Sequence, residues 1–182
     1  MATAKTGSFY LTETIELPPG TPDGNRLQST MDLSAYVNVP TGQAIAIDQC
    51  DFIWQVGGDF GSGAAAMMAA NGGLAAQLTD LNPGTAFVRA DNQSLIASAG
   101  LSIDRSANLA THTQDLYPDN FGPASLSESF MVVNDTLYLT AGPDQAATGV
   151  TSVFCTVRVR ARVVKLSQKD WMAIAIQSTA ES

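Results

Sequence analysis

The fold of this chain is decided by the stretch Cys155-Thr156-Val157-Arg158-Val159-Arg160-Ala161-Arg162-Val163-Val164-Lys165-Leu166. Alternate residues of a β-strand point to opposite sides of the sheet. One side of this strand is therefore apolar from Cys155 to Val163, and the other carries Thr156 followed by three arginines. Strict alternation of this kind predicts a strand with one face in a core and the other at a surface.

Most of the remaining chain is also typical of β-strands, and helical periodicity is almost absent. β-Branched, aromatic and threonine residues are concentrated in residues 8–17, 44–56, 129–133 and 136–140. The long segment 44–56 is expected to bend or bulge near Asp48 and Gln49. Further strands are predicted at 31–39, 85–89, 94–98 and 101–103, and residues 170–176 fit either a last strand or a terminal helix. These signals predict an antiparallel β-sandwich or barrel.

The 182 residues are enough for one domain with a substantial core, and we expect a single domain over residues 1–182. Residues 57–84 are rich in glycine and alanine, so we expect an insertion there with a loop and one or two short helices. Residues 104–127 are polar and contain two prolines, which predicts a long loop. A Gly-Pro loop is expected near residues 141–145.

The composition excludes several classes of protein. Nine Lys and Arg stand against 17 Asp and Glu, for a net charge of −8, and 45% of the residues are hydrophobic. A disordered chain, a disulfide-built mini-protein and a generally basic nucleic-acid binder do not fit these values.

Charge is also unevenly distributed along the chain. Residues 1–157 hold four cations and fifteen anions (−11), whereas residues 158–182 hold five cations and two anions (+3).

Much of this positive charge lies on the alternating strand. Arg158, Arg160 and Arg162 are about 7 Å apart along one side of it, where they repel one another. Something anionic is expected to compensate them: acidic residues of the same chain, an acidic surface of an adjacent subunit, or a polyanion such as nucleic acid or lipid phosphate. The residues predicted to face a subunit or a polyanion are Arg158, Arg160, Arg162, Lys165 and Lys169.

The sequence lacks the patterns that usually mark a catalytic or metal site. His112 is the only histidine, and histidine-based zinc sites need two or three. Cys50 and Cys155 lie in apolar runs without CxxC spacing, so we expect two small buried residues, with a disulfide between neighbouring strands as the alternative. We expect no cofactor, no metal, no small-molecule substrate and no enzymatic activity. Neither a secretion signal nor a membrane-spanning helix is expected.

Taken together, these segments resemble the coat proteins of icosahedral viruses built on a single jelly roll. The resemblance rests on residues 9–17 as an opening strand, the long bent strand 44–56, the long loops, and the ending from Asn134 to Leu166. That ending is similar to the last strands of small coat proteins from tailless, membrane-containing viruses of archaea and bacteria. The fold it implies is all-β: a single jelly-roll-like antiparallel sandwich of about eight strands, with long loops and one or two short helices.

The resemblance also implies a function. Such proteins are virion structural proteins that self-assemble into a capsid shell through lateral contacts between subunits. The implied partners are other copies of the chain, a second coat protein, and an internal membrane or the genome, met through the arginine-lined strand. Some of these families carry a basic N-terminal arm, but here Lys5 is the only cation before Arg26. A membrane-lined or separately condensed genome therefore fits better than packaging by an arm.

Three alternatives remain at this point. Within the same class, the chain is a head-decoration, spike or tail-tube protein. As a carbohydrate-binding or adhesin-like module, it would stack sugars on exposed aromatic residues; the candidates are Trp54, Tyr117, Phe121 and Trp171. As an enzyme on a β scaffold, it would use paired carboxylates, for which the candidates are Glu13, Glu16, Asp48, Asp51, Asp115 and Asp119.

Overall fold

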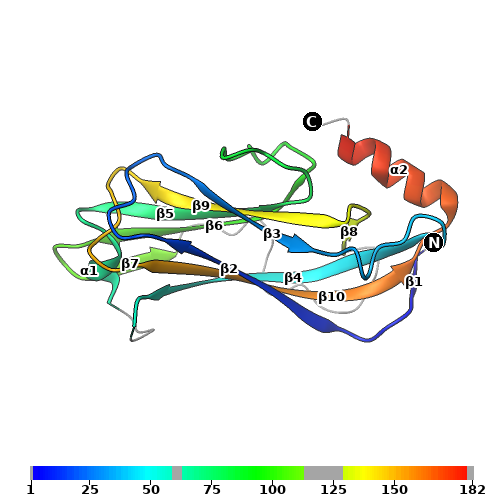
Figure 1. Cartoon of the computed structure of the whole chain (residues 1–182), viewed down its shortest axis with the longest axis horizontal. Helices are drawn as coiled ribbons and strands as arrows, with labels where there is room; N and C mark the ends of the chain where they lie inside the picture. The colour runs from blue at the N-terminus through cyan, green and yellow to red at the C-terminus, as the bar shows by residue number, and fades with distance from the viewer. Residues whose placement is uncertain (1, 59–62, 113–128, 180–182) are drawn as a thin grey trace.

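A computed structural model describes residues 2–58, 63–112 and 129–179 of the chain (Figure 1). Within these ranges it contains ten strands and two helices. The strands are β1 (Thr3–Ala4), β2 (Phe9–Leu17), β3 (Leu27–Asp32), β4 (Gln43–Val56), β5 (Gly72–Thr79), β6 (Leu95–Asp104), β7 (Leu109–His112), β8 (Phe130–Val132), β9 (Thr136–Asp144) and β10 (Val153–Lys165). The helices are α1 (Ala64–Met67) and α2 (Gln168–Thr179).

The strands form two antiparallel sheets that face each other as the two layers of a sandwich (Figure 1). In sheet A, β10 is central: β4 pairs with one of its edges, followed by β8, while β2 and β1 pair with the other edge. In sheet B the order is β3-β9-β5-β6-β7. The expected all-β sandwich is confirmed.

The path of the chain through these sheets is that of a jelly roll. β3, β5, β6 and β9 lie in sheet B, and β2, β4, β8 and β10 lie in sheet A. Along these eight strands the chain crosses to the other sheet at every step except that from β5 to β6. Only β5 and β6 are neighbours both in sequence and in space among these eight strands. Two four-stranded sheets connected in this way are the jelly-roll arrangement of interlocked Greek keys. β1 and β7 are short additions to the sheet edges.

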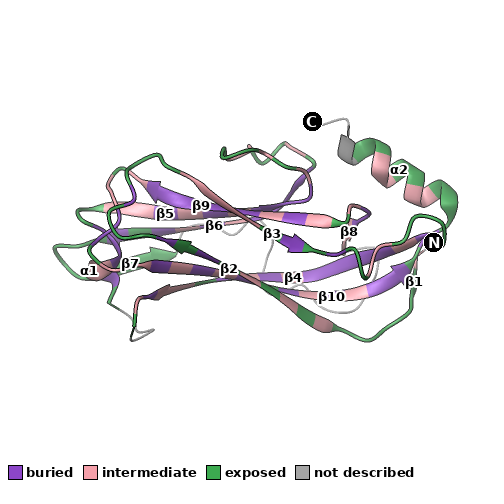
Figure 2. Ribbon diagram, in the orientation of Figure 1, coloured by how far each residue is buried: buried purple, intermediate pink, exposed green. Residues whose placement is uncertain are grey.

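The core lies between the two sheets and follows the predicted alternation along β10. Val153, Cys155, Val157, Val159, Ala161 and Val163 are all buried, whereas Thr156 and the three arginines between them are not. Figure 2 shows that the strands of both layers contain buried segments. Full burial of a valine side chain contributes about 1.5–3 kcal/mol, so this strand is a main source of stability.

Helix α2 covers a second, smaller apolar cluster. It begins after Ser167, whose hydroxyl accepts from the Asp170 N–H (3.1 Å) and donates to the Asp170 carboxylate (2.7 Å). Such a reciprocal cap explains why the terminal segment forms a helix rather than a strand. Trp171, Ile174 and Ala175 pack against Ala44, Ala46, Val133, Val164 and Leu166. Neither described helix is long and apolar enough to cross a membrane.

The structure corrects the interpretation of residues 57–84. A short helix is present there, α1, but Gly72–Thr79 is strand β5, which pairs with both β6 and β9. Leu74, Ala76 and Leu78 bury its inner face. Two flanking strands and this burial outweigh the poor strand propensity of glycine and alanine.

Other boundaries also differ from the expectations. β3 lies at Leu27–Asp32 rather than 31–39, the strands expected at 94–98 and 101–103 form one strand, β6, and β9 continues through the predicted Gly-Pro loop to Asp144. Residues 85–89 are not a strand. Instead, the Gln77 side chain donates to the Val88 carbonyl (2.9 Å) and accepts from the Val88 N–H (2.8 Å). The long loop predicted at 104–127 includes β7, and its residues 113–127 lie outside the described residues.

Candidate functional site

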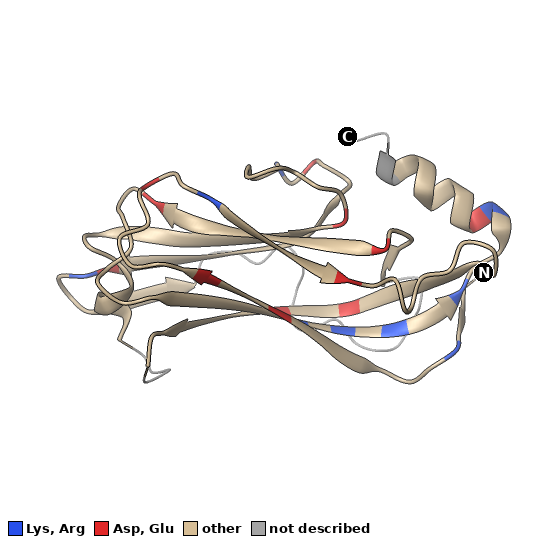
Figure 3. Cartoon of the chain, in the orientation of Figure 1, with Lys and Arg blue, Asp and Glu red and all other residues tan. Residues whose placement is uncertain are grey.

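The arginine-bearing side of β10 forms the outward surface of sheet A, together with β2 and β4. We call this surface the arginine face. In Figure 3 the basic residues of β10 lie along this sheet. The strand registers place its members as Tyr10, Thr12, Thr14 and Glu16 on β2, Phe154, Thr156, Arg158, Arg160 and Arg162 on β10, and Gln49, Asp51, Ile53 and Gln55 on β4.

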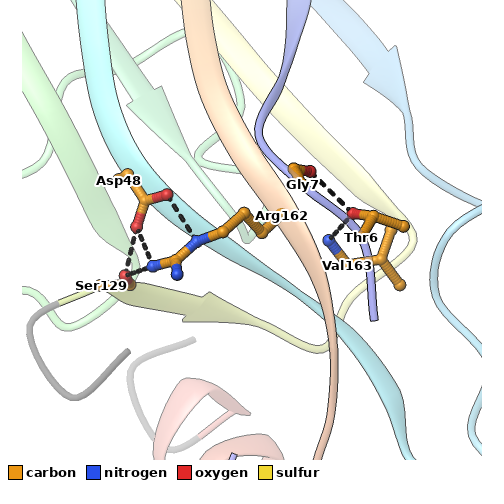
Figure 4. A network of polar contacts seen from close by, with 6 residues as sticks. All are labelled: Thr6, Gly7, Asp48, Ser129, Arg162 and Val163. Atoms are coloured by element: carbon orange, nitrogen blue, oxygen red, sulfur yellow. Dashed lines mark hydrogen bonds and ion pairs between the residues drawn. The ribbon is translucent and has the colours of Figure 1, made fainter. Parts of the chain in front are cut away.

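Arg162 is compensated within the chain. Its Nε and Nη2 atoms donate to the two carboxylate oxygens of Asp48 at 2.8 and 2.7 Å (Figure 4). Ser129 also donates to Asp48 (2.5 Å) and accepts from Arg162 (3.3 Å). The Asp48 side chain is 2% exposed and that of Arg162 14%. For this arginine, the hypothesis of an acidic partner in the same chain is confirmed.

The predicted bulge makes this pairing possible. Gln49 lies opposite Arg160 and Ile47 opposite Ala161, so Asp48 is the extra residue on β4. A bulge turns a side chain out of the regular alternation and bends the strand. The carboxylate can therefore reach Arg162, while Ile47 and Cys50 on either side of the bulge remain in the core.

Arg158 is in a different environment. It is exposed, and its guanidinium carbon lies 4.9 Å from the centre of the Tyr10 ring, within the range of a cation–π contact. None of the described carboxylates forms an ion pair with it. Asp51 lies opposite in the register, but its oxygens accept from Gln49 Nε2 at 3.2 and 3.3 Å. Arg158 is thus a presented cation supported by an aromatic ring.

The structure does not bring all five predicted cations to one site. Arg160 is half-buried on the arginine face, between Tyr10 and Gln49 in the register. Lys165 is the exposed last residue of β10, and Lys169 is exposed in the first turn of α2. Lys165 lies opposite Thr3, where β1 pairs with the end of β10. This connection is reinforced by the Thr6 hydroxyl, which accepts from the Val163 N–H (3.1 Å, Figure 4).

Between Arg158 and the far end of the face lies a row of uncharged residues. Thr14, Thr156 and Ile53 are in register across β2, β10 and β4, and we call them the central row. The two threonine hydroxyls are 2.8 Å apart, and Ile53 is 38% exposed. The sequence predicts the arginines but not this row or Tyr10, because the residues that lie side by side on different strands are determined by the strand register. The alternation of residues 9–17 was the signal that could have placed Tyr10 and Thr14 on one side of their strand.

Both cysteines are free and buried. Cys155 lies opposite Trp54 and Cys50 opposite Val159, so the two residues are offset by four register positions, about 13 Å along the strands. A disulfide needs Cα atoms no more than about 7 Å apart, so the disulfide alternative is wrong. Burial raises the pKa of both thiols far above its usual range. They behave as small core residues, as expected.

Among the carboxylates proposed for an enzyme, the four that the structure describes are each engaged separately. Glu13 accepts from Ser29 (2.6 Å), Glu16 from Ser152 (2.8 Å), and Asp48 and Asp51 from the partners given above. Glu13 faces the sandwich interior and Glu16 the arginine face. Asp115 and Asp119 lie outside the described residues. Within the described ranges, no group of three or more His, Cys, Asp or Glu could hold a metal ion.

Of the four aromatic residues proposed for sugar stacking, the two that the structure describes do not form an exposed platform. Trp54 packs against the main core, and Trp171 packs in the cluster beneath α2. Tyr117 and Phe121 lie outside the described residues, and His112 is exposed at the end of β7. A comparison of the chain with protein-family models finds no match, and a comparison with curated proteins finds none either.

Proposed function

We propose that this chain is a virion structural protein that self-assembles into a capsid shell through lateral contacts between subunits. The observation that carries the proposal is the strand order, since jelly rolls with two four-stranded sheets are a recurrent architecture of capsid domains. The expected partners are further copies of the chain and a second coat protein, and the expected location is the virion.

Features of the surface support an assembling protein over a sugar-binding module. Trp54 and Trp171 are withdrawn into apolar clusters, so the described surface gives sugar stacking little support. In contrast, Arg158 and Tyr10 are presented on a sheet face, and both residue types are enriched in protein–protein interfaces. The net charge of −8 also suggests that contacts between copies are controlled by salt.

Light scattering coupled to size-exclusion chromatography tests the proposal directly. The purified chain is run at a series of salt concentrations, and its cooperative thermal unfolding is recorded to show that the material is folded. We expect species whose mass is a large multiple of the 19.0 kDa chain mass. A folded protein that stays at 19.0 kDa at every concentration and salt condition would contradict the proposal.

A further inference from the structure

The arginine face carries opposite charges on the two sides of its central row. Arg158 lies two residues beyond Thr156 along β10, and Glu16 lies two residues beyond Thr14 along β2 in the other direction. The two charged residues are therefore each about 7 Å from the row and about 13 Å apart along the strands. Both are exposed.

We propose that two copies of this chain pack their arginine faces together about a two-fold axis that passes between Thr14 and Thr156. The axis is tilted by about 20° from the central row, so that it is perpendicular to the line from Arg158 on β10 to Glu16 on the neighbouring strand β2. In an isologous contact, each residue meets the position related to it by the axis. Arg158 of one copy then faces Glu16 of the second copy, and Glu16 of the first faces Arg158 of the second. This contact rests on the proposed function, because it is one contact through which copies of the chain would meet when they assemble.

Charge complementarity is the argument for a second copy as the occupant. One side of the row carries Arg158, Arg160 and Asp51, with a net positive charge, and the other carries Glu16, so a two-fold operation brings opposite net charges together. A uniform polyanion would have to pass over the Glu16 carboxylate, which accepts a hydrogen bond from the Ser152 hydroxyl but pairs with none of the described cations. Arg158 has no ion pair among the described residues and is held in place by Tyr10, so little side-chain freedom is lost when it meets a carboxylate.

The other residues of the face suit close packing of two sheets. Tyr10 is 54% exposed and Ile53 38%, and arginine and tyrosine are typical of interface residues that dominate binding energy. Residues near the axis lie near their own counterparts, so Ile53 packs beside Ile53 of the second copy. Thr14 and Thr156 are short enough to allow the two sheets to approach, as they do in aligned sandwiches.

The size of the face predicts a weak contact in isolation. Beyond the row, β2 continues for three residues to Leu17, which is about 10 Å, so strands of the two copies overlap over about 20 Å, and three strands are about 14 Å wide. The resulting area of about 280 Å² is roughly a third of what each partner buries in a standard interface. Such a contact is strengthened when it is repeated in an assembly. Covalent trapping is therefore a better test than the mass of the free dimer.

A cysteine beside the axis supplies that trap. In Thr14→Cys, the introduced thiols of two copies lie close together, and a short thiol-to-thiol cross-linker joins them. Cys50 and Cys155 do not compete because both are buried. Thr30→Cys is the matched control, since Thr30 is an exposed strand threonine on the outward side of sheet B. We expect cross-linked dimers of Thr14→Cys and only background dimers of Thr30→Cys.

Charge reversal in the Thr14→Cys background tests the pairing itself. Arg158→Glu and Glu16→Arg each place like charges opposite one another twice per dimer, and we expect about a tenfold fall in dimer yield for each. The double variant restores both pairs and should restore the yield. The net charge moves from −8 to −10 in the first variant and to −6 in the second, so a general charge effect would move the two yields in opposite directions.

The outcomes separate this inference from the proposed function. Thr14→Cys dimers that fall with both single reversals and return in the double variant support it. Equal trapping of Thr14→Cys and Thr30→Cys, or opposite effects of the two single reversals, would overturn it. If particles form but Thr14→Cys gives no cross-linked dimers, the inference is overturned and the proposed function still stands. Binding of inorganic polyphosphate that is lost in Arg158→Glu, with no trapping, would assign the face to a polyanion instead.

Discussion

Both carboxylate oxygens of Asp48 accept hydrogen bonds from Arg162, although the two residues are 114 positions apart in the sequence. The pair is almost entirely removed from water and joins β4 to β10, with Ser129 holding the start of β8 beside it. Arg158, four residues earlier on the same side of the same strand, is exposed and has no ion pair among the described residues. Residues of one type on one face therefore have different environments: Arg162 pairs within the fold, and Arg158 is presented at the surface beside Tyr10.

Removing Arg162 should destabilise the fold strongly. Arg162→Leu leaves the Asp48 carboxylate buried without its cation, which costs about 3–5 kcal/mol. Urea unfolding followed by tryptophan fluorescence measures the change in the free energy of unfolding. Arg158→Leu is the control, and because Arg158 is exposed its effect should stay within about 0.5 kcal/mol. Equal losses in the two variants would contradict this difference in environment.

The two thiols should be silent in the folded protein and should appear on unfolding. Burial raises the pKa of Cys50 and Cys155, so neither forms a reactive thiolate under ordinary conditions. A thiol reagent should label neither residue in native buffer and both in urea. Rapid labelling of either cysteine in the native protein would contradict its burial in the core.

The same burial predicts a loss of stability at alkaline pH. A thiol whose folded pKa is raised stays protonated while the unfolded chain ionises, so its contribution is complete below the ordinary thiol pKa of 9.0 and declines as the pH rises above it. The free energy of unfolding should therefore fall above pH 9.0. A Cys50→Ala/Cys155→Ala double variant should show a shallower fall over the same range, and identical slopes would contradict the assignment.

Gly142 should tolerate no side chain. It lies in β9 opposite Ala75, and a Cβ atom there would overlap the backbone carbonyl of Asn25. Gly142→Ala should therefore cost about 1–3 kcal/mol through forced backbone movement. Gly58→Ala is the control, because a Cβ at Gly58 has nothing within 4 Å. Thermal melting of both variants checks the difference.

The packing of α2 should depend on its inner side alone. Ile174 packs against the small residues of β4 and also lines a cavity of about 220 Å³ between α2 and the body, whereas Met172 is 51% exposed. Ile174→Ala should weaken helix docking by about 1–2 kcal/mol, so that the amides of α2 exchange with solvent roughly tenfold faster. Met172→Ala should leave their exchange nearly unchanged. The opposite ranking would mean that the helix is seated differently.

Sequence reasoning succeeded where local pattern determines structure. The alternation from Cys155 to Val163 predicted the buried and outward sides of β10, and the interrupted pattern around Asp48 predicted the bulge. It failed for Gly72–Thr79, since a strand of small residues between two longer strands has little local signal of its own. The spacing Ser167-x-x-Asp170 is a capping signature that was available to separate helix from strand at the C-terminus.

The candidate site was predictable only in part, because its chemistry depends on distant pairings. The three arginines could be placed on one side of a strand, but only the fold shows that Asp48 neutralises Arg162 and that Tyr10 supports Arg158. Lys165 and Lys169 were predicted to belong with the arginines because they are close to them in the sequence. In the structure Lys165 is the last residue of β10 and Lys169 lies in α2, so neither is part of the arginine face.

Electron microscopy of negatively stained, purified protein tests the central claim most directly. A subunit that forms a capsid shell through lateral contacts should appear as closed particles or as regular capsomers of uniform size, under at least one salt condition in which the chain remains folded. Fields of isolated 19.0 kDa subunits at every protein and salt concentration would contradict the account.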